Sequence, residues 1–353
     1  MKHLCVSERE RTQLYKRIVR KCIYIESNEV EDLRNEVFLN DYTPSLNTCM
    51  NIDEYGFWHS AGKSISLENS IPNKIFYRKD WIEVPYKEAK ESRRDVLVRE
   101  SVNQCGLSVI ILSPFKSHPS PAVVICLGGP LTPIPNIHEE DSIYQTLIES
   151  GFTLIIPLRR GVVGISPEWE AALENHYGEY DVQDTIEATR FAAAYHPEMI
   201  DKNRIYLYGG SYGGYVAELI AGKCNADRLF KAIIAHCGIY DLATYPWHNK
   251  GIPEETMQTY GHTTNRKEYS ANVAKISPKS FVDNWDVPIL LIHHLNDMSS
   301  WFGQSVAAYN DALMHGKHVD LLIVPGPHTY EVKHRDVLFR RIVSFFTQNK
   351  VFN

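Results

Sequence analysis

The chain has 353 residues, of which 44% are hydrophobic and 11% aromatic, so it can bury a large core as one sizeable domain or as one domain with an appendage. A net charge of −6 and an isoelectric point near 6.2, with scattered basic residues, exclude the electrostatic profile of a nucleic-acid-binding protein. The sequence has no apolar signal segment, no apolar run of about 18 residues that could span a bilayer, and no Cys-x-x-Cys pair among its seven cysteines. We therefore expect a cytoplasmic protein without a membrane partner, a nucleic-acid partner or a thiolate metal site.

Residues 1–80 are expected to form an N-terminal segment that is helical and then irregular. A capping box at 7–10 precedes one apolar stripe and a second stripe follows over 30–37, so two short helices are predicted. Residues 41–75 are rich in Asn, Ser, Pro and Tyr and show no periodicity, which is typical of a loop-rich connection. Because the apolar stripes need a surface to pack on, we expect a small cap over the following domain or a contact between two copies of the chain.

Strand and helix patterns alternate from Trp81 onward, which predicts a second domain over 81–353. The predicted strands are 81–84, 96–100, 107–112, 122–126, 152–157, 204–208, 231–235, 288–293 and 319–324. The predicted helices lie near 141–149, 181–195, 212–222, 302–315 and 336–347. This alternation predicts an α/β fold in which a mostly parallel central sheet, antiparallel at its start, has helices on both faces. Ligands of such sheets bind at the carboxyl ends of strands, so functional residues are expected in the loops that follow strands.

The run Tyr206–Tyr215 places Ser211 in a Gly-x-Ser-x-Gly pattern between a predicted strand and a predicted helix. A serine on such a sharp turn needs strained backbone angles and small neighbours, which accounts for Gly209 and Gly213. The helix that begins near Tyr212 points its free N–H groups and the positive end of its dipole at the serine. This context predicts a serine nucleophile rather than an ordinary glycine-flanked turn.

A serine nucleophile needs a base, and the base needs a carboxylate that orients it. Asp297 follows one predicted strand, and His328 follows the next, so both lie in loops of the expected kind. The chain order Ser211, Asp297, His328 is that of the α/β-hydrolase fold. The sequence therefore predicts a Ser-His-Asp triad with His328 as the general base.

A metal site is the alternative explanation for the histidines of this region. His293 and His294 are adjacent in a predicted strand and should point to opposite faces of the sheet, and no third ligand has a suitable spacing. The run His138–Asp141 is more typical of a polar helix entrance than of a ligand set. We therefore predict neither a metal nor a cofactor.

An oxyanion hole requires backbone N–H groups that face the serine. The predicted strand 122–126 runs into Gly128 and Gly129, where the absence of side chains lets bare N–H groups approach a tetrahedral intermediate. We expect the N–H of Gly129 to act together with the N–H of Tyr212.

These motifs resemble the hydrolase domain of the prolyl oligopeptidase family of serine peptidases, in particular its acylaminoacyl-peptidase-like and dipeptidyl-peptidase-like branches. The resemblance runs from about Glu83 to the end of the chain and implies an α/β-hydrolase fold. Further matches are the Arg-Gly pair Arg160–Gly161, the stretches 178–184 and 276–278, and Gln304–Ser305 after the Asp loop.

The chain departs from the family pattern in several places. Leu127 stands where the family has His or a Tyr whose hydroxyl completes the oxyanion hole, so only backbone donors are expected here. His294 replaces a usual glycine, and Ser300–Trp301 replaces a usual Val-Pro. About 80 residues without blade-like repeats precede the domain, so the family's substrate-filtering β-propeller is not expected.

Three functions from different classes are compatible with these residues. The first is a serine hydrolase that cleaves a peptide amide or ester of a small-molecule or short-peptide acyl substrate through an acyl-enzyme. The second is an acyltransferase or cyclase of a biosynthetic pathway, in which a nucleophile other than water resolves the same acyl-enzyme. The third, suggested only by Leu127, is a catalytically silent binding protein. We favour the hydrolase because nucleophile, base and orienting carboxylate are all present.

Overall fold

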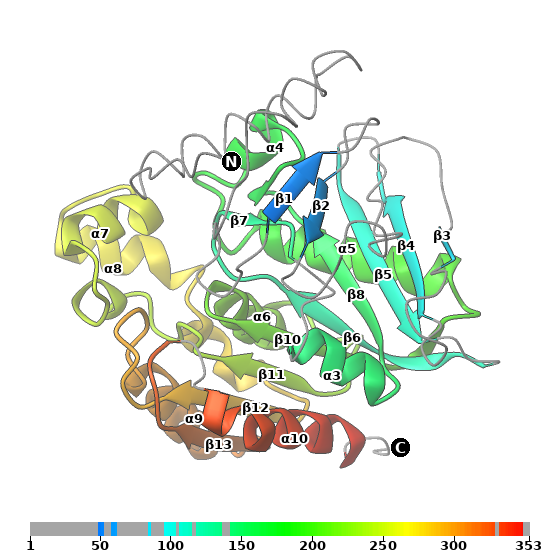
Figure 1. Ribbon diagram of the computed structural model, residues 1–353. Coiled ribbons are helices and arrows are strands. Elements are labelled where there is room, and N and C mark those ends of the chain that lie inside the picture. Colours follow the sequence, from blue (N-terminus) through cyan, green and yellow to red (C-terminus); the bar gives the residue numbers. More distant parts are fainter. Residues whose placement is uncertain are drawn as a thin grey trace.

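A central sheet organises the protein, and nine strands of the described residues belong to it (Figure 1). The computed structural model describes residues 49–52, 58–61, 84–85, 95–103, 106–114, 118–135, 142–328 and 332–348. The strand order in the sheet is β13-β12-β11-β10-β6-β8-β5-β4-β3. The strands are β3 (Val84–Pro85), β4 (Asp95–Ser101), β5 (Ser108–Pro114), β6 (Ser120–Cys126), β8 (Thr153–Leu158), β10 (Ile200–Gly210), β11 (Ile233–His236), β12 (Ile289–His294) and β13 (Val319–Val324).

The sheet is parallel from β13 to β8 and antiparallel from β8 through β5 and β4 to β3. The carboxyl ends of β6, β10, β11, β12 and β13 therefore meet at one edge of the sheet. This arrangement confirms the predicted α/β-hydrolase fold with its antiparallel start. The loops expected to carry the site leave the sheet at this edge.

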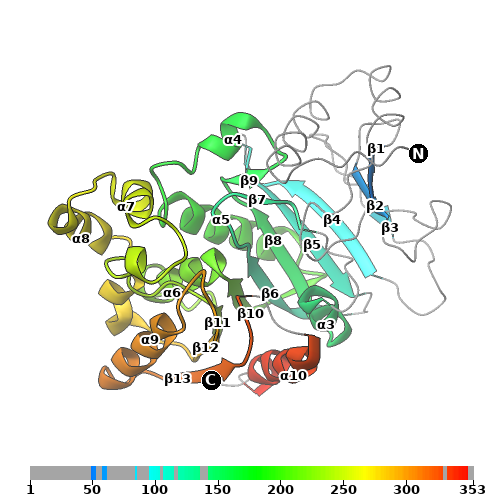
Figure 2. The ribbon, with the colours of Figure 1, turned by 60° about the vertical axis from the view of Figure 1, so that its left-hand side comes forward.

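Helices cover both faces of the sheet (Figure 2). One layer holds α3 and α10, and the other holds α5, α6 and α9. The bounds of these helices are α3 (Ile143–Glu149), α5 (Tyr180–Tyr195), α6 (Tyr212–Lys223), α9 (Gly303–Met314) and α10 (Val332–Gln348). The strands read as continuous apolar runs because both faces are buried: adjacent Val124 and Ile125 on β6 enter opposite core clusters.

Several elements differ from the sequence predictions. The short antiparallel hairpin of β1 (Cys49–Ile52) and β2 (Trp58–Ala61) lies in the stretch expected to be a loop-rich connection. Elements that the sequence reasoning missed are β7 (Thr132–Pro133), β9 (Val162–Val163), α4 (Pro167–Ala171), η1 (Tyr245–Trp247), α7 (Pro253–Gly261), α8 (Arg266–Ala274) and η2 (Pro278–Asn284). The predicted helices near 7–19 and 30–37 lie outside the described residues, as does 81–83 of the first predicted strand.

The missed helices α7 and α8 pack beside each other, at the left of Figure 1. Each shows local start signals: Pro253 occupies the first turn of α7, and the Asn265 side chain accepts from the N–H groups of Lys267 and Glu268 at the start of α8. Few of their residues are buried, so their apolar stripes are short. Among the described residues, no helix combines the length and the apolar character that crossing a bilayer requires.

Candidate active site

Ser211 occupies a strained turn between β10 and α6. Its backbone has φ of 57° and ψ of −122°, a conformation rare for a residue with a side chain, and its N–H donates to the carbonyl of His236 at 2.7 Å. The glycines around it have a steric reason. A Cβ on Gly209 would lie 2.0 Å from the carbonyl oxygen of Gly213, and a Cβ on Gly213 would lie 2.0 Å from that of Cys126. The turn thus holds Ser211 only because these positions lack side chains.

The structure brings Ser211, His328 and Asp297 together from the loops after β10, β13 and β12. The Oγ of Ser211 lies 2.8 Å from Nε2 of His328, and Nδ1 of His328 lies 2.6 Å from Oδ2 of Asp297. A carboxylate only accepts, so Nδ1 carries the proton and Nε2 offers its lone pair to the serine hydroxyl. The Asp297 side chain is fully buried while that of His328 is 25% exposed, so the charge is shielded and the imidazole remains accessible.

The turn after β12 fixes the Asp297 carboxylate. Its Oδ1 accepts the N–H groups of Ser299 at 2.8 Å and of Ser300 at 2.9 Å. Burial disfavours the charged form, but hydrogen bonds from two imidazoles and from the Ser300 N–H outweigh this effect and hold the pKa of Asp297 well below its usual range. The carboxylate is therefore ionised at every pH at which an imidazole changes charge.

His293 is the second imidazole at Asp297, and the sequence reasoning missed this role. Its Nε2 lies 2.6 Å from the carbonyl oxygen of Ser300 and 3.3 Å from Oδ2 of Asp297, and its Nδ1 lies 2.7 Å from the hydroxyl of Ser305. A carbonyl accepts, so Nε2 is protonated and Nδ1 accepts from Ser305. The match of Gln304–Ser305 to the family pattern was the available signal, because Ser305 orients the ring that supports Asp297.

His294 points to the opposite face of the sheet and pairs with His236. The two Nε2 atoms lie 2.8 Å apart with ring planes 15° from parallel, and Nδ1 of His236 lies 2.9 Å from the Tyr208 hydroxyl. The spacing along the chain indicated no third ligand, but in space His236, Cys237 and His294 offer ligand atoms within 4.8 Å of one another. A separation of 2.8 Å is nevertheless that of a hydrogen bond, shorter than the roughly 3.3 Å between two nitrogens around tetrahedral zinc.

This buried pair predicts a specific acid sensitivity of folding. Burial, followed by the neighbouring His293, lowers the pKa of His294 to about 4, and burial lowers that of His236 well below its usual value. The unfolded chain binds these protons near pH 6.5 and the folded protein does not, so the free energy of unfolding should fall as the pH drops from about 6.5 to about 4.

Denaturant unfolding across that pH range measures this effect. The slope of unfolding free energy against pH should be smaller in His294→Gln than in the wild type. The exposed His118 lies outside the pair, and His118→Gln provides the matched substitution for comparison. Equal slopes in His294→Gln and the wild type would show that the pair does not bind protons on unfolding.

The glycine loop after β6 lies against the serine turn, as expected for an oxyanion hole. A Cβ on Gly128 would lie 3.5 Å from the carbonyl oxygen of Gly210 and 3.8 Å from Cβ of Ser211. Within the described part of the chain, the N–H groups of Gly128, Gly129 and Tyr212 donate to no protein acceptor. The Leu127 side chain is only 4% exposed and belongs to the core cluster under α3 and α10, so it packs in the core.

The fold and this array define the class of the protein, an α/β-hydrolase of the serine type. The model of the prolyl oligopeptidase family matches residues 139–350, which is more than half of the chain. The chain therefore belongs to the prolyl oligopeptidase family, and the resemblance inferred from the motifs is confirmed.

Individual relatives agree with this assignment. The dipeptidyl-peptidase 5 of Porphyromonas endodontalis is 29% identical over 232 residues, covering 63% of this chain and 32% of the relative, and that of Porphyromonas gingivalis is 28% identical over 235 residues, covering 66% and 34%. The chain thus spans about a third of the length of these relatives. The structure of an acylaminoacyl peptidase from Pyrococcus horikoshii has the same fold, with a TM-score of 0.64 and 23% identity, covering 74% of this chain and 43% of that one.

Proposed function

We propose that the protein is a serine hydrolase that cleaves a peptide amide or an ester through an acyl-enzyme. The observation that carries the proposal is the unbroken chain of hydrogen bonds from Ser211 Oγ through His328 to Asp297 on a strained strand-to-helix turn. A nucleophile, a base in reach of its proton, and a carboxylate that fixes the base are the parts that acyl transfer requires.

The acylation step follows from the tautomer that the contacts impose. Ser211 Oγ attacks the substrate carbonyl carbon while Nε2 of His328 takes the hydroxyl proton, so the imidazole becomes an imidazolium. The ionised Asp297 stabilises that cation through Nδ1–H and keeps the ring in place. The tetrahedral intermediate then collapses as Nε2–H of His328 gives its proton to the leaving amine or alcohol.

Deacylation repeats these steps with water in the place of serine. His328 takes a proton from the attacking water, and the proton returns to Ser211 when the acid product leaves. In both steps the negative oxygen forms at the start of α6, where the N–H of Tyr212 and the N–H of Gly129 are the proposed donors. His293 acts as a positioning residue for Asp297 and touches no reacting atom.

The proposed substrate is a short peptide or another small acyl compound. Family membership supports a peptidase, and the relatives are named as dipeptidyl peptidases and acylaminoacyl peptidases. The matching region, however, makes up only 32% to 43% of the length of those proteins. Acyl transfer to a nucleophile other than water would use the same residues. The products distinguish the two outcomes, since hydrolysis releases the free acid.

Labelling by a fluorophosphonate tests the proposal, because this reagent phosphonylates a serine only when the serine is activated. We expect the wild type to be labelled on Ser211, and Ser211→Ala to be unlabelled. A panel of aminoacyl anilides and short-chain esters then identifies the acyl group. The absence of labelling in a folded wild-type protein would contradict the proposed activity.

Acidification is expected to remove activity in a single proton step. The imidazolium form of His328 has no lone pair at Nε2, whereas Asp297 keeps its charge because its pKa is held well below the usual range. The value of kcat/KM should therefore fall on acidification, by about tenfold for each pH unit below the midpoint of the step. The measurement uses one substrate at constant ionic strength, with circular dichroism at each pH to show that the protein is folded. A flat profile would exclude an imidazole base.

A further inference from the structure

Arg159 is a buried cation directly beneath the glycine loop. It lies at the end of β8, is only 1% exposed, and donates to four main-chain carbonyls. Its Nη2 donates to Leu127 at 3.2 Å and Gly128 at 2.9 Å, and its Nη1 donates to Pro130 at 3.0 Å and Arg160 at 2.8 Å. Each of the four N–H groups on the two terminal nitrogens thus donates to a backbone oxygen, and three of these oxygens lie in the loop after β6.

These contacts determine where the loop's N–H groups point. In a planar trans peptide the C=O and the following N–H point in opposite directions. The peptides Leu127–Gly128 and Gly128–Gly129 are trans, and Arg159 binds both of their carbonyls. The N–H groups of Gly128 and Gly129 must therefore point away from Arg159. Because a Cβ on Gly128 would lie 3.8 Å from Cβ of Ser211, the loop lies beside the nucleophile, and N–H groups directed away from Arg159 are free to serve an oxyanion there.

The same arrangement polarises these peptides. A positive charge bound to a carbonyl oxygen withdraws electron density from the amide, which makes its N–H a stronger donor, and burial strengthens the effect. The guanidinium also lies 5.2 Å from the ring centroid of Tyr212, the residue after the nucleophile. The hydroxyl of Tyr212 donates to Asp181, a buried carboxyl whose pKa is raised by burial and lowered in part by the nearby charge of Arg159. Arg159 thus contacts both the glycine loop, through its hydrogen bonds, and the first residue of α6, through the Tyr212 ring.

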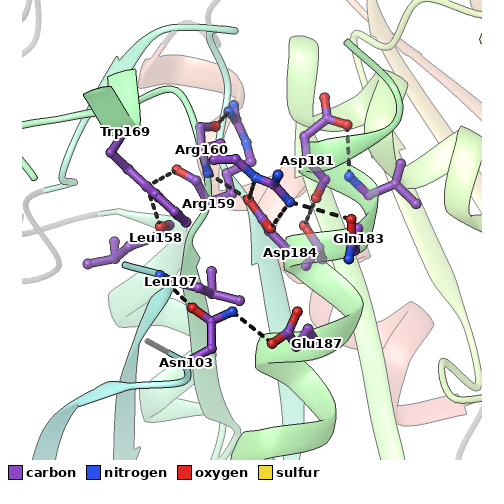
Figure 3. A network of polar contacts seen from close by, with 12 residues as sticks. Asn103, Leu107, Leu158, Arg159, Arg160, Trp169, Asp181, Gln183, Asp184 and Glu187 are labelled. Carbon is purple, nitrogen blue, oxygen red and sulfur yellow. Dashed lines mark hydrogen bonds and ion pairs between the residues drawn. The ribbon is translucent and has the colours of Figure 1, made fainter. Parts of the chain in front are cut away.

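Arg159 is distinct from the arginine that matches the family pattern. Figure 3 shows Arg160 extended toward Asp184, with which it forms a salt bridge at 2.6 Å. The Trp169 indole N–H donates to the carbonyl of Arg159 at 2.9 Å and so holds the main chain of this residue. The two adjacent arginines therefore point to different partners, and Arg160 provides a matched control.

We propose that Arg159 is a positioning residue for the oxyanion hole: it orients and polarises the N–H groups of Gly128 and Gly129. This inference rests on the proposed hydrolase function. Because Leu127 supplies no hydroxyl donor, the reaction depends on these backbone groups, and their orientation should affect the transition state more than the bound substrate.

The test compares Arg159→Met, Arg159→Lys and the control Arg160→Lys. For each protein, kcat is measured on an anilide and on an activated ester of the same acyl group. The values are expressed per active site, and the sites are counted by fluorophosphonate labelling taken to completion. Arg159→Met should lower kcat on the anilide by about 100-fold, with a smaller loss on the ester and KM within about threefold. Arg159→Lys, which keeps the charge but loses the fork, should be intermediate, and Arg160→Lys should match the wild type.

An aldehyde inhibitor gives a second measurement, because its adduct with serine carries an oxygen in the oxyanion hole. In Arg159→Met the affinity for the aldehyde should fall by a factor similar to the loss of kcat. The affinity for the matched alcohol, which forms no adduct, should not change. A merely structural role would lower the melting temperature or the number of labelled sites and leave kcat per site unchanged, which would overturn the inference. If Arg159→Met does not fold, Arg159→Lys provides the test. A ratio of anilide to ester turnover below that of the wild type supports the inference, and an unchanged ratio overturns it. A wild type without labelling at Ser211 would overturn the proposed function as well, so the two failures are distinguishable.

Discussion

Ser211→Ala is expected to lower kcat by about 10⁴ to 10⁶ while the protein remains folded. The hydroxyl supplies the atom that forms the acyl-enzyme, and alanine leaves only transition-state stabilisation by the oxyanion hole and binding. Removal of Oγ creates no buried unpaired charge, because its partner His328 is part-exposed. Steady-state kinetics and thermal unfolding of the same preparation separate loss of chemistry from loss of structure.

His328→Ala should reduce kcat to a similar extent, and the double variant should be little worse than either single variant. Such non-additivity is the signature of residues that act as one unit. The exposed His118 lies outside the site, and His118→Ala serves as the control. Activity of Ser211→Ala within tenfold of the wild type would mean that another nucleophile operates. If the loss of kcat in the double variant equals the product of the two single losses, Ser211 and His328 act independently.

Much of the fold and the proposed triad were accessible from the sequence because their signals are local. A strand buried on both faces reads as an apolar run, and the sheet topology places the residues after each such run at one edge. Ser211, Asp297 and His328 each follow a predicted strand, so knowing the strands was sufficient to expect them together. The predicted fold class was confirmed because it depends on the same local strand and helix patterns.

The supporting residues could not be predicted because their roles depend on which strands become neighbours. His293 and His294 are adjacent in sequence, yet one holds Asp297 and the other pairs with His236 from the next strand. Arg159 gave no local signal, since its partners lie about 30 residues away in the loop after β6. A strand order that is not sequential, here β8 between β6 and β5, brings Arg159 to the loop after β6, and no local pattern encodes it.

Gly213→Ala is expected to destabilise the protein strongly and to abolish activity. The added Cβ would lie 2.0 Å from the carbonyl oxygen of Cys126 and 3.0 Å from that of Leu127, and both contacts are with main chain that cannot rotate away. Either α6 or the end of β6 must move, which separates Ser211 from the glycine loop. Overpacking of this kind costs about 3 kcal/mol or more, corresponding to a melting temperature lower by roughly 10 °C for a domain of this size.

The same turn offers a matched control in Gly210. Among the described residues, a Cβ there would have only the Tyr208 hydroxyl within 4 Å, at 4.0 Å, so Gly210→Ala should melt within about 2 °C of the wild type. Thermal unfolding of the two variants and the wild type, together with fluorophosphonate labelling, measures both consequences. The close packing of α6 on β6 is what makes Gly213 necessary. A Gly213→Ala variant that melts and labels like the wild type would show that α6 does not approach β6 so closely, and the steric explanation of the serine turn would then fail.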